Sequence, residues 1–354
     1  MTEQSGQPGQ AGQAGQAEQT GQGGQAGHAG QPGQTGQAGR AGQPGQPEQA
    51  VQSGRRGSDE TRSGFVTFVG RPNVGKSTLT NALVGEKIAI TSEKPQTTRR
   101  AIRGILNRPD GQLVIVDTPG IHKPRTLLGE RLNDLVEQVL GDVDVIGFCV
   151  PATEKVGPGD RRIAASLDGY PRAKKVAIVT KTDAAARDDI VERLMEVDSL
   201  REDWAAVIPL SALTREQLDV LADEMLQLMP LGPRLYEDGI VTDESDEDRI
   251  AEIIREASLE GVRDELPHSI AVVVDDVAPR EDSDLTDVYA SIVVERDSQK
   301  AIIIGRKGAR LRDVGAVARE GIEELLGTRV FLKLHVKVAK EWQRDPKQLG
   351  RLGF

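Results

Sequence analysis

Short apolar runs alternate with longer amphipathic stretches along the chain from residue 65 to about residue 230. Six runs rich in valine and isoleucine stand out, at residues 65–69, 101–106, 112–117, 143–150, 174–180 and 206–212. Strands that read as nearly continuous apolar residues are buried on both faces, as in parallel sheets. Between them, residues 131–140 and 214–229 carry apolar residues at helical spacing. The pattern predicts a doubly wound α/β domain that ends near Met229.

A second and smaller pattern follows a break at Pro230, Gly232 and Pro233. The acidic residues 243–248 favour a helix start, because carboxylates are stabilised in the first turn of a helix. The pattern then predicts a helix, two strands, a second helix and a third strand, at about residues 250–257, 269–277, 287–295, 309–326 and 330–338. We therefore expect an α/β domain at 63–230, a linker at 231–245 and a small α+β domain at 246–354.

The first 62 residues have a different composition, consisting up to Gln49 almost entirely of Gly, Gln, Ala and Pro. Such a segment buries too little apolar surface to offset its ordering entropy. Glycine recurs at every third position, as in collagen, but Glu18 and Glu48 break the period. We expect a disordered tail. Because no apolar run approaches the roughly 18 residues of a membrane span, and no signal peptide is present, we also expect a soluble, cytoplasmic protein.

Charge is distributed unevenly along the chain, whose net charge is −10. Residues 301–354 hold twelve Lys or Arg against six Asp or Glu, so this end carries +6 while the rest carries −16. A basic terminal segment in an acidic protein is a candidate surface for a polyanion, although a solvated helix face would give the same charge. The single cysteine, Cys149, lies in an apolar run and is expected in the core.

A phosphate-binding motif follows the first predicted strand, because residues 70–77 (GRPNVGKS) fit G-x-x-x-x-G-K-[ST]. The glycines let backbone N–H groups close around phosphates at a helix N-terminus, Lys76 can reach the β and γ oxygens, and Ser77 can ligate magnesium. The predicted phosphate-binding residues are Gly70, Asn73, Val74, Gly75, Lys76, Ser77 and Thr78.

A metal partner for this loop is expected at Asp117, which closes an apolar strand and is followed by Thr118-Pro119-Gly120. The Asp117 carboxylate would contact magnesium through water, and the Gly120 N–H would contact the γ-phosphate. In the polar loop at 92–100, Thr98 is the candidate switch residue that ligates magnesium, with Thr97 as the alternative. The sequence thus predicts Ser77, Thr98 and Asp117 at the metal, and Lys76, Thr98 and Gly120 in catalysis.

The stretch AIVTKTD at 177–183 identifies the base. Its aspartate, Asp183, can accept hydrogen bonds from N1–H and the exocyclic amine of guanine, a donor pair that adenine lacks. The stem of Lys181 would lie along the ring, and the Ala212 N–H would donate to guanine O6. The predicted guanine-binding residues are Thr180, Lys181, Asp183, Ser211 and Ala212. We therefore expect GTP and GDP as ligands.

Together, GRPNVGKS, TTR, DTPG, TKTD and SA resemble the five motifs of small GTPases related to translation factors. The sequence departs from that pattern at Thr180, where most such proteins have asparagine, and at Ile121, where Ras-like enzymes place a water-orienting glutamine. Because isoleucine cannot orient water, hydrolysis must draw on another group or on an ion. In related GTPases with asparagine at the Asn73 position, that residue can help hold potassium. We expect slow intrinsic turnover.

In the second domain, Gly305-Arg306-Lys307-Gly308 links a short apolar step to a helix. A GxxG turn with basic middle residues lets a single-stranded nucleic acid backbone approach, while the helix N-terminus and the basic residues, Arg310 among them, meet its phosphates. In this order of elements the segment resembles a KH domain of the bacterial topology. The alternative is an ordinary glycine turn in a basic α+β domain.

A GTPase domain followed by a KH domain resembles the Era family, from about Gly64 to Phe354, including the KPQTTR loop and the terminal LGRLGF. The resemblance implies binding near the 3′ end of 16S ribosomal RNA and a role in assembly and maturation of the small (30S) ribosomal subunit. It also implies that some members associate loosely with the inner face of the membrane, and we expect a monomer. We expect nucleotide-dependent order in the Thr98 loop and in the segment after Gly120 to control the KH surface through the linker at 231–245, so that RNA and nucleotide affinities are coupled.

Two other functions remain open from the residues alone. A metabolic P-loop kinase or ATPase would prefer ATP and would not contact RNA, but Asp183 and Ala212 favour guanine over adenine. A membrane-recruited GTPase would use its basic end on anionic lipid, and its lipid binding would not depend on Gly305 and Gly308.

Overall fold

The structure is a computed structural model that describes residues 61–91, 98–120, 124–262, 266 and 269–354. These residues all belong to one compact unit, Arg56–Phe354. The tail predicted at 1–62 lies outside the described residues apart from its last two.

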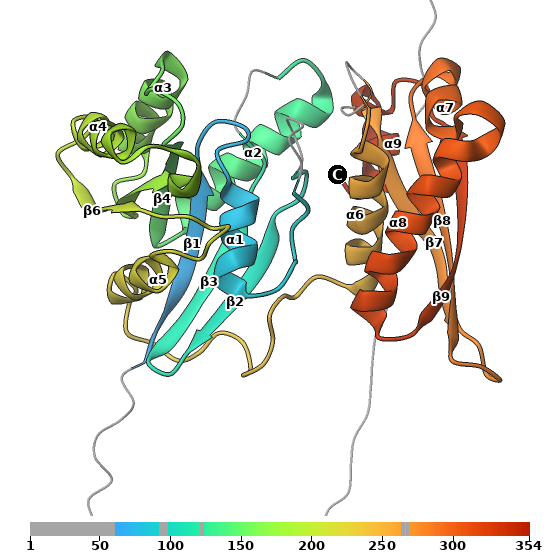
Figure 1. The fold of residues 1–354 in the computed structure, drawn as a ribbon, viewed down its shortest axis with the longest axis horizontal. Helices are drawn as coiled ribbons and strands as arrows, with labels where there is room; N and C mark the ends of the chain where they lie inside the picture. The colour runs from blue at the N-terminus through green and yellow to red at the C-terminus, as the bar shows by residue number, and fades with distance from the viewer. Residues whose placement is uncertain (1–60, 92–97, 121–123, 263–265, 267–268) are drawn as a thin grey trace, which may run out of the picture. The chain divides into compact units, whose positions relative to one another are not determined.

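A six-stranded sheet forms the first domain (Figure 1). Its strands are β1 (Arg62–Val69), β2 (Ile102–Arg108), β3 (Gly111–Asp117), β4 (Val145–Pro151), β5 (Lys174–Thr180) and β6 (Trp204–Pro209), in the order β2-β3-β1-β4-β5-β6. Neighbouring strands are parallel except for β2, which is antiparallel to β3. The apolar pattern predicted all six strands but not this orientation. The antiparallel pairing of β2 with β3 follows from the two-residue connection at 109–110, because a parallel pair of strands needs a long crossover.

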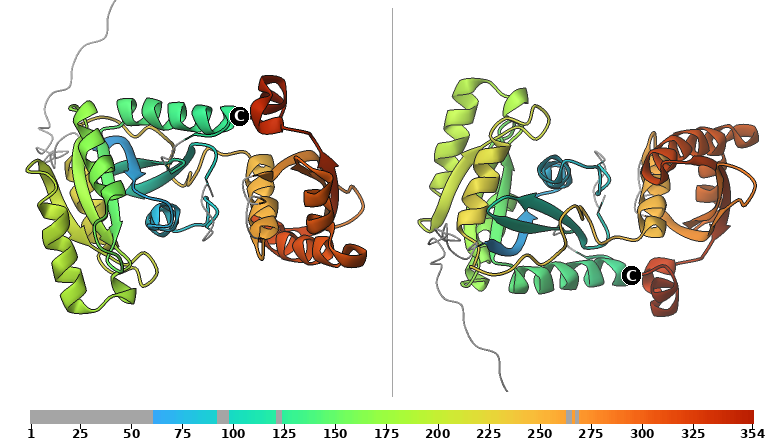
Figure 2. Two further views of the ribbon diagram at one scale, coloured as in Figure 1. Left: turned by 90° about the horizontal axis from the view of Figure 1, so that it is seen from above. Right: turned by 90° about the horizontal axis from the view of Figure 1, so that it is seen from below.

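Helices cover both faces of this sheet, as Figures 1 and 2 show. On one face, α1 (Lys76–Val84) and α5 (Leu218–Gln227) share a core with the strands. On the other, the helices are α2 (Leu127–Asp142), α3 (Pro158–Ser166) and α4 (Arg187–Asp198). Short 3-10 turns, η1 (Leu167–Gly169) and η2 (Thr182–Ala184), follow α3 and β5. The two cores confirm the doubly wound architecture.

A three-stranded sheet in the order β7-β8-β9 forms the second domain. Its elements are α6 (Asp246–Leu259), β7 (Ala271–Pro279), β8 (Leu285–Val294), α7 (Asp297–Ile304), η4 (Arg306–Gly308), α8 (Ala309–Leu326) and β9 (Arg329–Val338). The helices α6, α7 and α8 pack against one face, and β8 runs parallel to β9. The predicted apolar step before the GxxG turn is therefore the end of a helix, α7. The order helix, strand, strand, helix, helix, strand confirms the α+β domain.

After β9 the chain forms two elements that the apolar pattern did not predict, η5 (Trp342–Arg344) and α9 (Pro346–Arg351). Trp342, Leu349 and Leu352 are buried in one cluster with Ala271 and Val293. The carboxyl-terminal segment thus covers apolar residues of β7 and β8 on the face away from α6 and α8.

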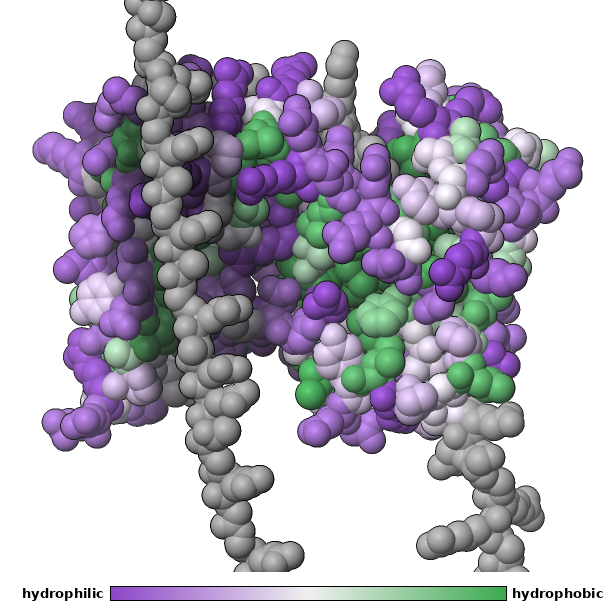
Figure 3. All heavy atoms as spheres, turned by 180° about the vertical axis from the view of Figure 1, so that it is seen from behind, coloured by the Kyte–Doolittle hydropathy of each residue, from purple (hydrophilic) through white to green (hydrophobic). Residues whose placement is uncertain are grey.

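On the face seen in Figure 3, hydrophilic side chains dominate the surface, and apolar side chains show as patches between them. Among the residues that the structure describes, none of the helices combines the length and the apolar character that crossing a membrane requires.

Candidate nucleotide site and candidate RNA loop

The predicted nucleotide motifs meet at one edge of the six-stranded sheet. The P-loop follows β1, Asp117 ends β3, Thr180 ends β5, and Ser211 follows β6. Because the carboxyl ends of parallel strands lie at the same edge, the sheet brings together motifs that are far apart in the sequence.

The P-loop wraps onto the N-terminus of α1. Gly75 is the N-cap of α1 and has a φ of 101°, a left-handed conformation that glycine adopts most easily. Lys76 is buried, and its Nζ donates to the carbonyls of Gly70 and Arg71 at 3.2 and 3.1 Å. Burial lowers the pKa of Lys76, against the attraction of Asp117, which raises it. The other predicted phosphate-binding residues lie in this loop or in the first turn of α1: Asn73, Val74, Ser77 and Thr78.

Three side-chain oxygens converge beside Lys76. Ser77 Oγ and Thr98 Oγ1 lie 3.1 Å apart, and Thr98 Oγ1 donates to Asp117 Oδ2 at 3.0 Å. The other carboxylate oxygen, Asp117 Oδ1, is buried and has no hydrogen-bond partner within the described residues. Burial raises the pKa of Asp117, and the nearby hydroxyls of Ser77 and Thr98 together with the charge of Lys76 oppose the rise. Hard oxygen donors of this kind fit magnesium. The alternative switch residue, Thr97, lies outside the described part of the chain.

Gly120 lies next to the same group. A Cβ on Gly120 would stand 3.8 Å from both Lys76 Nζ and Pro72 Cγ. The backbone of Gly120 therefore lies close to Lys76, for which the sequence predicts phosphate binding. Ile121, at the position where Ras-like enzymes place a glutamine, lies outside the described residues.

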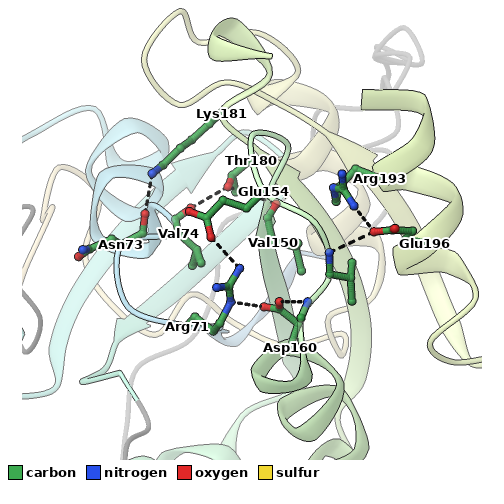
Figure 4. Close-up of polar contacts among 12 residues, drawn as sticks. Arg71, Asn73, Val74, Val150, Glu154, Asp160, Thr180, Lys181, Arg193 and Glu196 are labelled. Atoms are coloured by element: carbon green, nitrogen blue, oxygen red, sulfur yellow. Dashed lines mark hydrogen bonds and ion pairs between the residues drawn. The ribbon is translucent and has the colours of Figure 1, made fainter. Parts of the chain in front are cut away.

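The guanine motif is held by its own side chains. Ser211 Oγ donates to Asp183 Oδ1 at 2.6 Å and accepts from Thr214 N at 3.1 Å, which fixes the orientation of the Asp183 carboxylate. Ala212 follows directly in the chain and is half-buried. Lys181 has a φ of 59°, and its Nζ donates to the carbonyl of Asn73 at 2.6 Å (Figure 4). The guanine motif and the P-loop are thus in direct contact.

Thr180 supplies a second contact between these two motifs. Its Oγ1 lies 2.7 Å from the carbonyl of Val74 and 3.4 Å from that of Val150 (Figure 4). A hydroxyl has one hydrogen, so it donates to one carbonyl at a time, and the geometry favours Val74. The threonine that replaces the usual asparagine therefore still reaches the P-loop.

The GxxG turn, between α7 and α8, exposes two cations. Gly305, Lys307 and Gly308 have φ values of 70°, 52° and 75°. Arg306 and Lys307 are exposed, whereas the guanidinium of Arg310 donates to the carbonyls of Ser258 and Glu260 at the end of α6, at 3.2 and 2.7 Å. The predicted loop residues thus share one turn, with Arg310 engaged by the neighbouring helix.

Arg99, adjacent to Thr98, was not singled out from the sequence. It is 2% exposed, its Nη1 donates to the carbonyl of Ile270 at 2.5 Å, and its guanidinium lies 6.0 Å from the centre of the Trp342 ring. Burial lowers its pKa, with repulsion from Arg255 as the next cause. In the sequence Arg99 is one of two arginines that follow Thr98, and no local pattern predicts its contacts. Ile270 and Trp342 lie more than 170 positions away.

Comparisons with known proteins agree with this geometry. Residues 65–182 match the family described as 50S ribosome-binding GTPase, and residues 265–343 match the KH domain family. The chain is 61% identical over 301 residues to GTPase Era of Streptomyces coelicolor, covering 83% of this chain and 95% of that protein. It is 60% identical over 297 residues to GTPase Era of Mycolicibacterium smegmatis, covering 83% and 99%.

Two solved structures are similar over the same share of the chain. One is a tyrosine-to-alanine variant of Aquifex aeolicus Era bound to GDP and AlF4−, and the other is Era in complex with MgGDPNP and nucleotides 1506–1542 of 16S ribosomal RNA. Each has a TM-score of 0.79 and 34% sequence identity, and covers 83% of this chain and 99% of the other.

Proposed function

The chain belongs to the Era family of GTPases, and from this premise we propose that it is a GTP-controlled RNA-binding protein of small-subunit assembly. Its RNA would be the 3′ region of 16S ribosomal RNA, bound through the KH domain in the cytoplasm during maturation of the 30S subunit. The observation that carries the proposal is the exposed Arg306-Lys307 turn on a chain that also holds a complete set of guanine-nucleotide motifs. We place the linker between the two domains at 231–245.

For the nucleotide, we assign a role to each of the side chains at this edge of the sheet. Lys76 and the N-terminus of α1 would bind the β- and γ-phosphates, and Asp183 with the Ala212 N–H would bind guanine. Ser77, Thr98 and Asp117 would hold magnesium, which when bound neutralises charge on the β- and γ-oxygens. Asn73 would help to hold potassium. With no glutamine after Gly120 to orient water, we expect slow hydrolysis.

For RNA, the exposed cations of the turn would meet the phosphates. Gly305 and Gly308 place no side chain at the first and last positions of the turn, so a nucleotide backbone can approach Arg306 and Lys307 and the N-terminus of α8. We assign Arg310 a positioning role, because its guanidinium holds the turn to the carbonyls at the end of α6.

Coupling between the two ligands would pass through neighbouring residues of one loop. Thr98 is the proposed magnesium ligand, and the next residue, Arg99, is hydrogen-bonded to the carbonyl of Ile270 just before β7. Any change at Thr98 that follows loss of the γ-phosphate would therefore act on the KH domain through Arg99.

The test is a titration of the full chain with single-stranded RNA from the 16S 3′ end, with a GTP analogue, GDP or no nucleotide. An Arg306→Ala/Lys307→Ala variant should lose most of its RNA affinity, whereas Lys340→Ala/Lys347→Ala removes the same charge from exposed sites of the same domain and should lose little. Asp183→Asn should shift preference from GTP to XTP. Equal RNA affinity in all three nucleotide states would contradict the switch.

A liposome arm separates the RNA function from membrane recruitment. Vesicles with anionic headgroups should bind weakly, and a GxxG substitution should not change that binding. Tight vesicle binding without RNA binding in any state would overturn the RNA assignment and leave the GTPase intact.

A further inference from the structure

Arg71 lies inside the P-loop, but its side chain leaves the loop and extends toward α3 (Figure 4). Its Nε donates to Asp160 Oδ1 at 2.8 Å, and its Nη2 donates to Glu154 Oε2 at 3.0 Å. The two acids differ in exposure, because the Asp160 side chain is fully buried whereas that of Glu154 is 55% exposed. A fully buried carboxylate cannot exchange its partner for water, so the pair with Asp160 is the stronger constraint.

Asp160 also holds a second segment. Its Oδ2 accepts a hydrogen bond from Gly157 N at 2.8 Å, at the start of α3. On the other side of the same β4–α3 loop, Glu196 of α4 accepts from Val156 N at 3.1 Å and pairs with Arg193. Both acids therefore fix this loop, but of the two it is Asp160 that also contacts the P-loop.

The Arg71 side chain is confined from more than one side. Burial alone would lower its pKa, but the hydrogen bond and charge of Asp160, supported by Glu154, raise it, so the guanidinium keeps its charge at any working pH. A Cβ on Gly159 would stand 3.0 Å from Arg71 Cδ. The guanidinium is thus held by charge and its aliphatic stem by packing.

The backbone of Arg71 also helps to place Lys76, the proposed phosphate-binding lysine. The Arg71 carbonyl accepts a hydrogen bond from Lys76 Nζ at 3.1 Å. Two residues later Asn73 has a φ of 64°, a conformation that surrounding contacts must maintain in a residue with a side chain. A displacement of about 1 Å in such a loop can cost on the order of 100-fold in rate.

We propose that Arg71 and Asp160 are positioning residues for GTP hydrolysis. Their ion pair ties the interior of the P-loop to α3 and holds Lys76 in register with the reacting phosphates. This rests on the GTPase activity of the chain and is independent of its RNA partner.

The test compares Asp160→Asn with Glu196→Gln in the full chain. Asp160→Asn keeps the shape of the side chain but removes the charge that holds Arg71, and we expect kcat to fall about tenfold with little change in KM. Glu196→Gln weakens the same β4–α3 loop from its other side without touching the P-loop, and we expect kcat to stay at the wild-type value. The melting temperatures of both variants measure how much each substitution destabilises the fold.

Arg71→Ala and the double variant complete the cycle. If the two residues act through one contact, the double variant should be no slower than the slower single variant. Gly159→Ala, which crowds the Arg71 stem and leaves every charge in place, serves if Asp160→Asn does not fold, and it too should lower kcat.

Wild-type kcat in Asp160→Asn and Gly159→Ala, with only a lower melting temperature, would overturn the proposal and leave a contact that stabilises the fold. Absence of GTP hydrolysis by the wild-type chain would instead contradict the GTPase assignment. The two failures are therefore distinguishable.

Discussion

At the scale of single residues, Thr180 contacts the P-loop from the position where most related GTPases have asparagine. Its hydroxyl lies 2.7 Å from the Val74 carbonyl. In Thr180→Val, which has nearly the same shape, a carbonyl of the P-loop loses its donor at a cost of about 1–3 kcal/mol. We expect the Kd for GDP to rise roughly tenfold.

Fluorescent-nucleotide titration measures this change, with Thr180→Ser as the control that keeps the hydroxyl and should bind almost as wild type. Unchanged GDP affinity in Thr180→Val would show that the hydrogen bond does not hold the loop.

Cys149 gives a second prediction at this scale. Burial raises the pKa of its thiol to about 12, from the ordinary value of 9.0. Below about pH 9 the thiol is protonated in both the folded and the unfolded chain. Above that, the unfolded chain releases the proton while the folded chain keeps it, so stability falls as pH rises toward 12, by up to about 1.4 kcal/mol per unit.

Urea unfolding between pH 8 and 10 measures the slope, and Cys149→Ala removes this contribution while leaving the other titrating groups. At pH 8 a thiol reagent should label the folded chain slowly. Rapid labelling, or identical slopes in the two proteins, would contradict a buried thiol.

The sequence singled out Lys76, Asp117 and Asp183 because a motif fixes both their chemistry and their spacing, and the structure brings their motifs to one edge of the sheet. Their roles at the nucleotide stay predictions. The sequence did not identify Arg71 or Arg99 as anchors, because their partners are 89 and 171 positions away. An arginine in a loop gives no local signal of which distant carboxylate or carbonyl it will meet.

At the scale of elements, the two glycines of the GxxG turn should not be equivalent. Both have positive φ, which costs a residue with a side chain of order 1 kcal/mol or more. A Cβ at Gly305 would also lie 2.7 Å from Arg310 Cβ, whereas at Gly308 it would meet nothing within 4 Å. Gly305→Ala should therefore destabilise the KH domain by about 1–3 kcal/mol more than Gly308→Ala.

A Trp204→Phe background leaves Trp342 as the sole tryptophan, so its fluorescence reports unfolding of the carboxyl-terminal region. Equal unfolding midpoints for the two alanine variants would show that the turn relaxes freely around Gly305.

Apolar periodicity predicted most elements because it reports which face is buried. It missed the direction of β2, which depends on a two-residue connection, and it missed α9, whose six residues include few apolar ones. Burial of Trp342 beside Ala271 and Val293 supplies the tertiary contact that short elements need, and no local pattern contains it.

At the scale of the whole molecule, Arg99 should determine whether nucleotide and RNA affinities depend on each other. In Arg99→Ala the bond to the Ile270 carbonyl is lost, while Thr98, Ser77 and Asp117 remain. We expect the ratio of RNA affinities in the GTP-analogue and GDP states to approach one, with nucleotide affinity in the absence of RNA close to wild type.

Arg103→Ala is the matched control, since Arg103 is a neighbouring cation in an exposed pair with Asp243. RNA titrations in both nucleotide states measure the ratio. A wild-type ratio in Arg99→Ala would place the coupling elsewhere.

The position of β1 has a consequence for the time course of synthesis. It is the first strand of the sheet to be synthesised, yet it lies between β3 and β4. Thr61, just before β1, donates through Oγ1 to the carbonyl of Gly232 at 2.7 Å, across 171 residues of sequence. At about 5–20 residues per second, roughly 10 to 30 s separate these two residues on the ribosome. A nascent chain paused after Ala212 would already carry every nucleotide motif and both strands that pair with β1, but would lack the Gly232 carbonyl that accepts the hydrogen bond from Thr61.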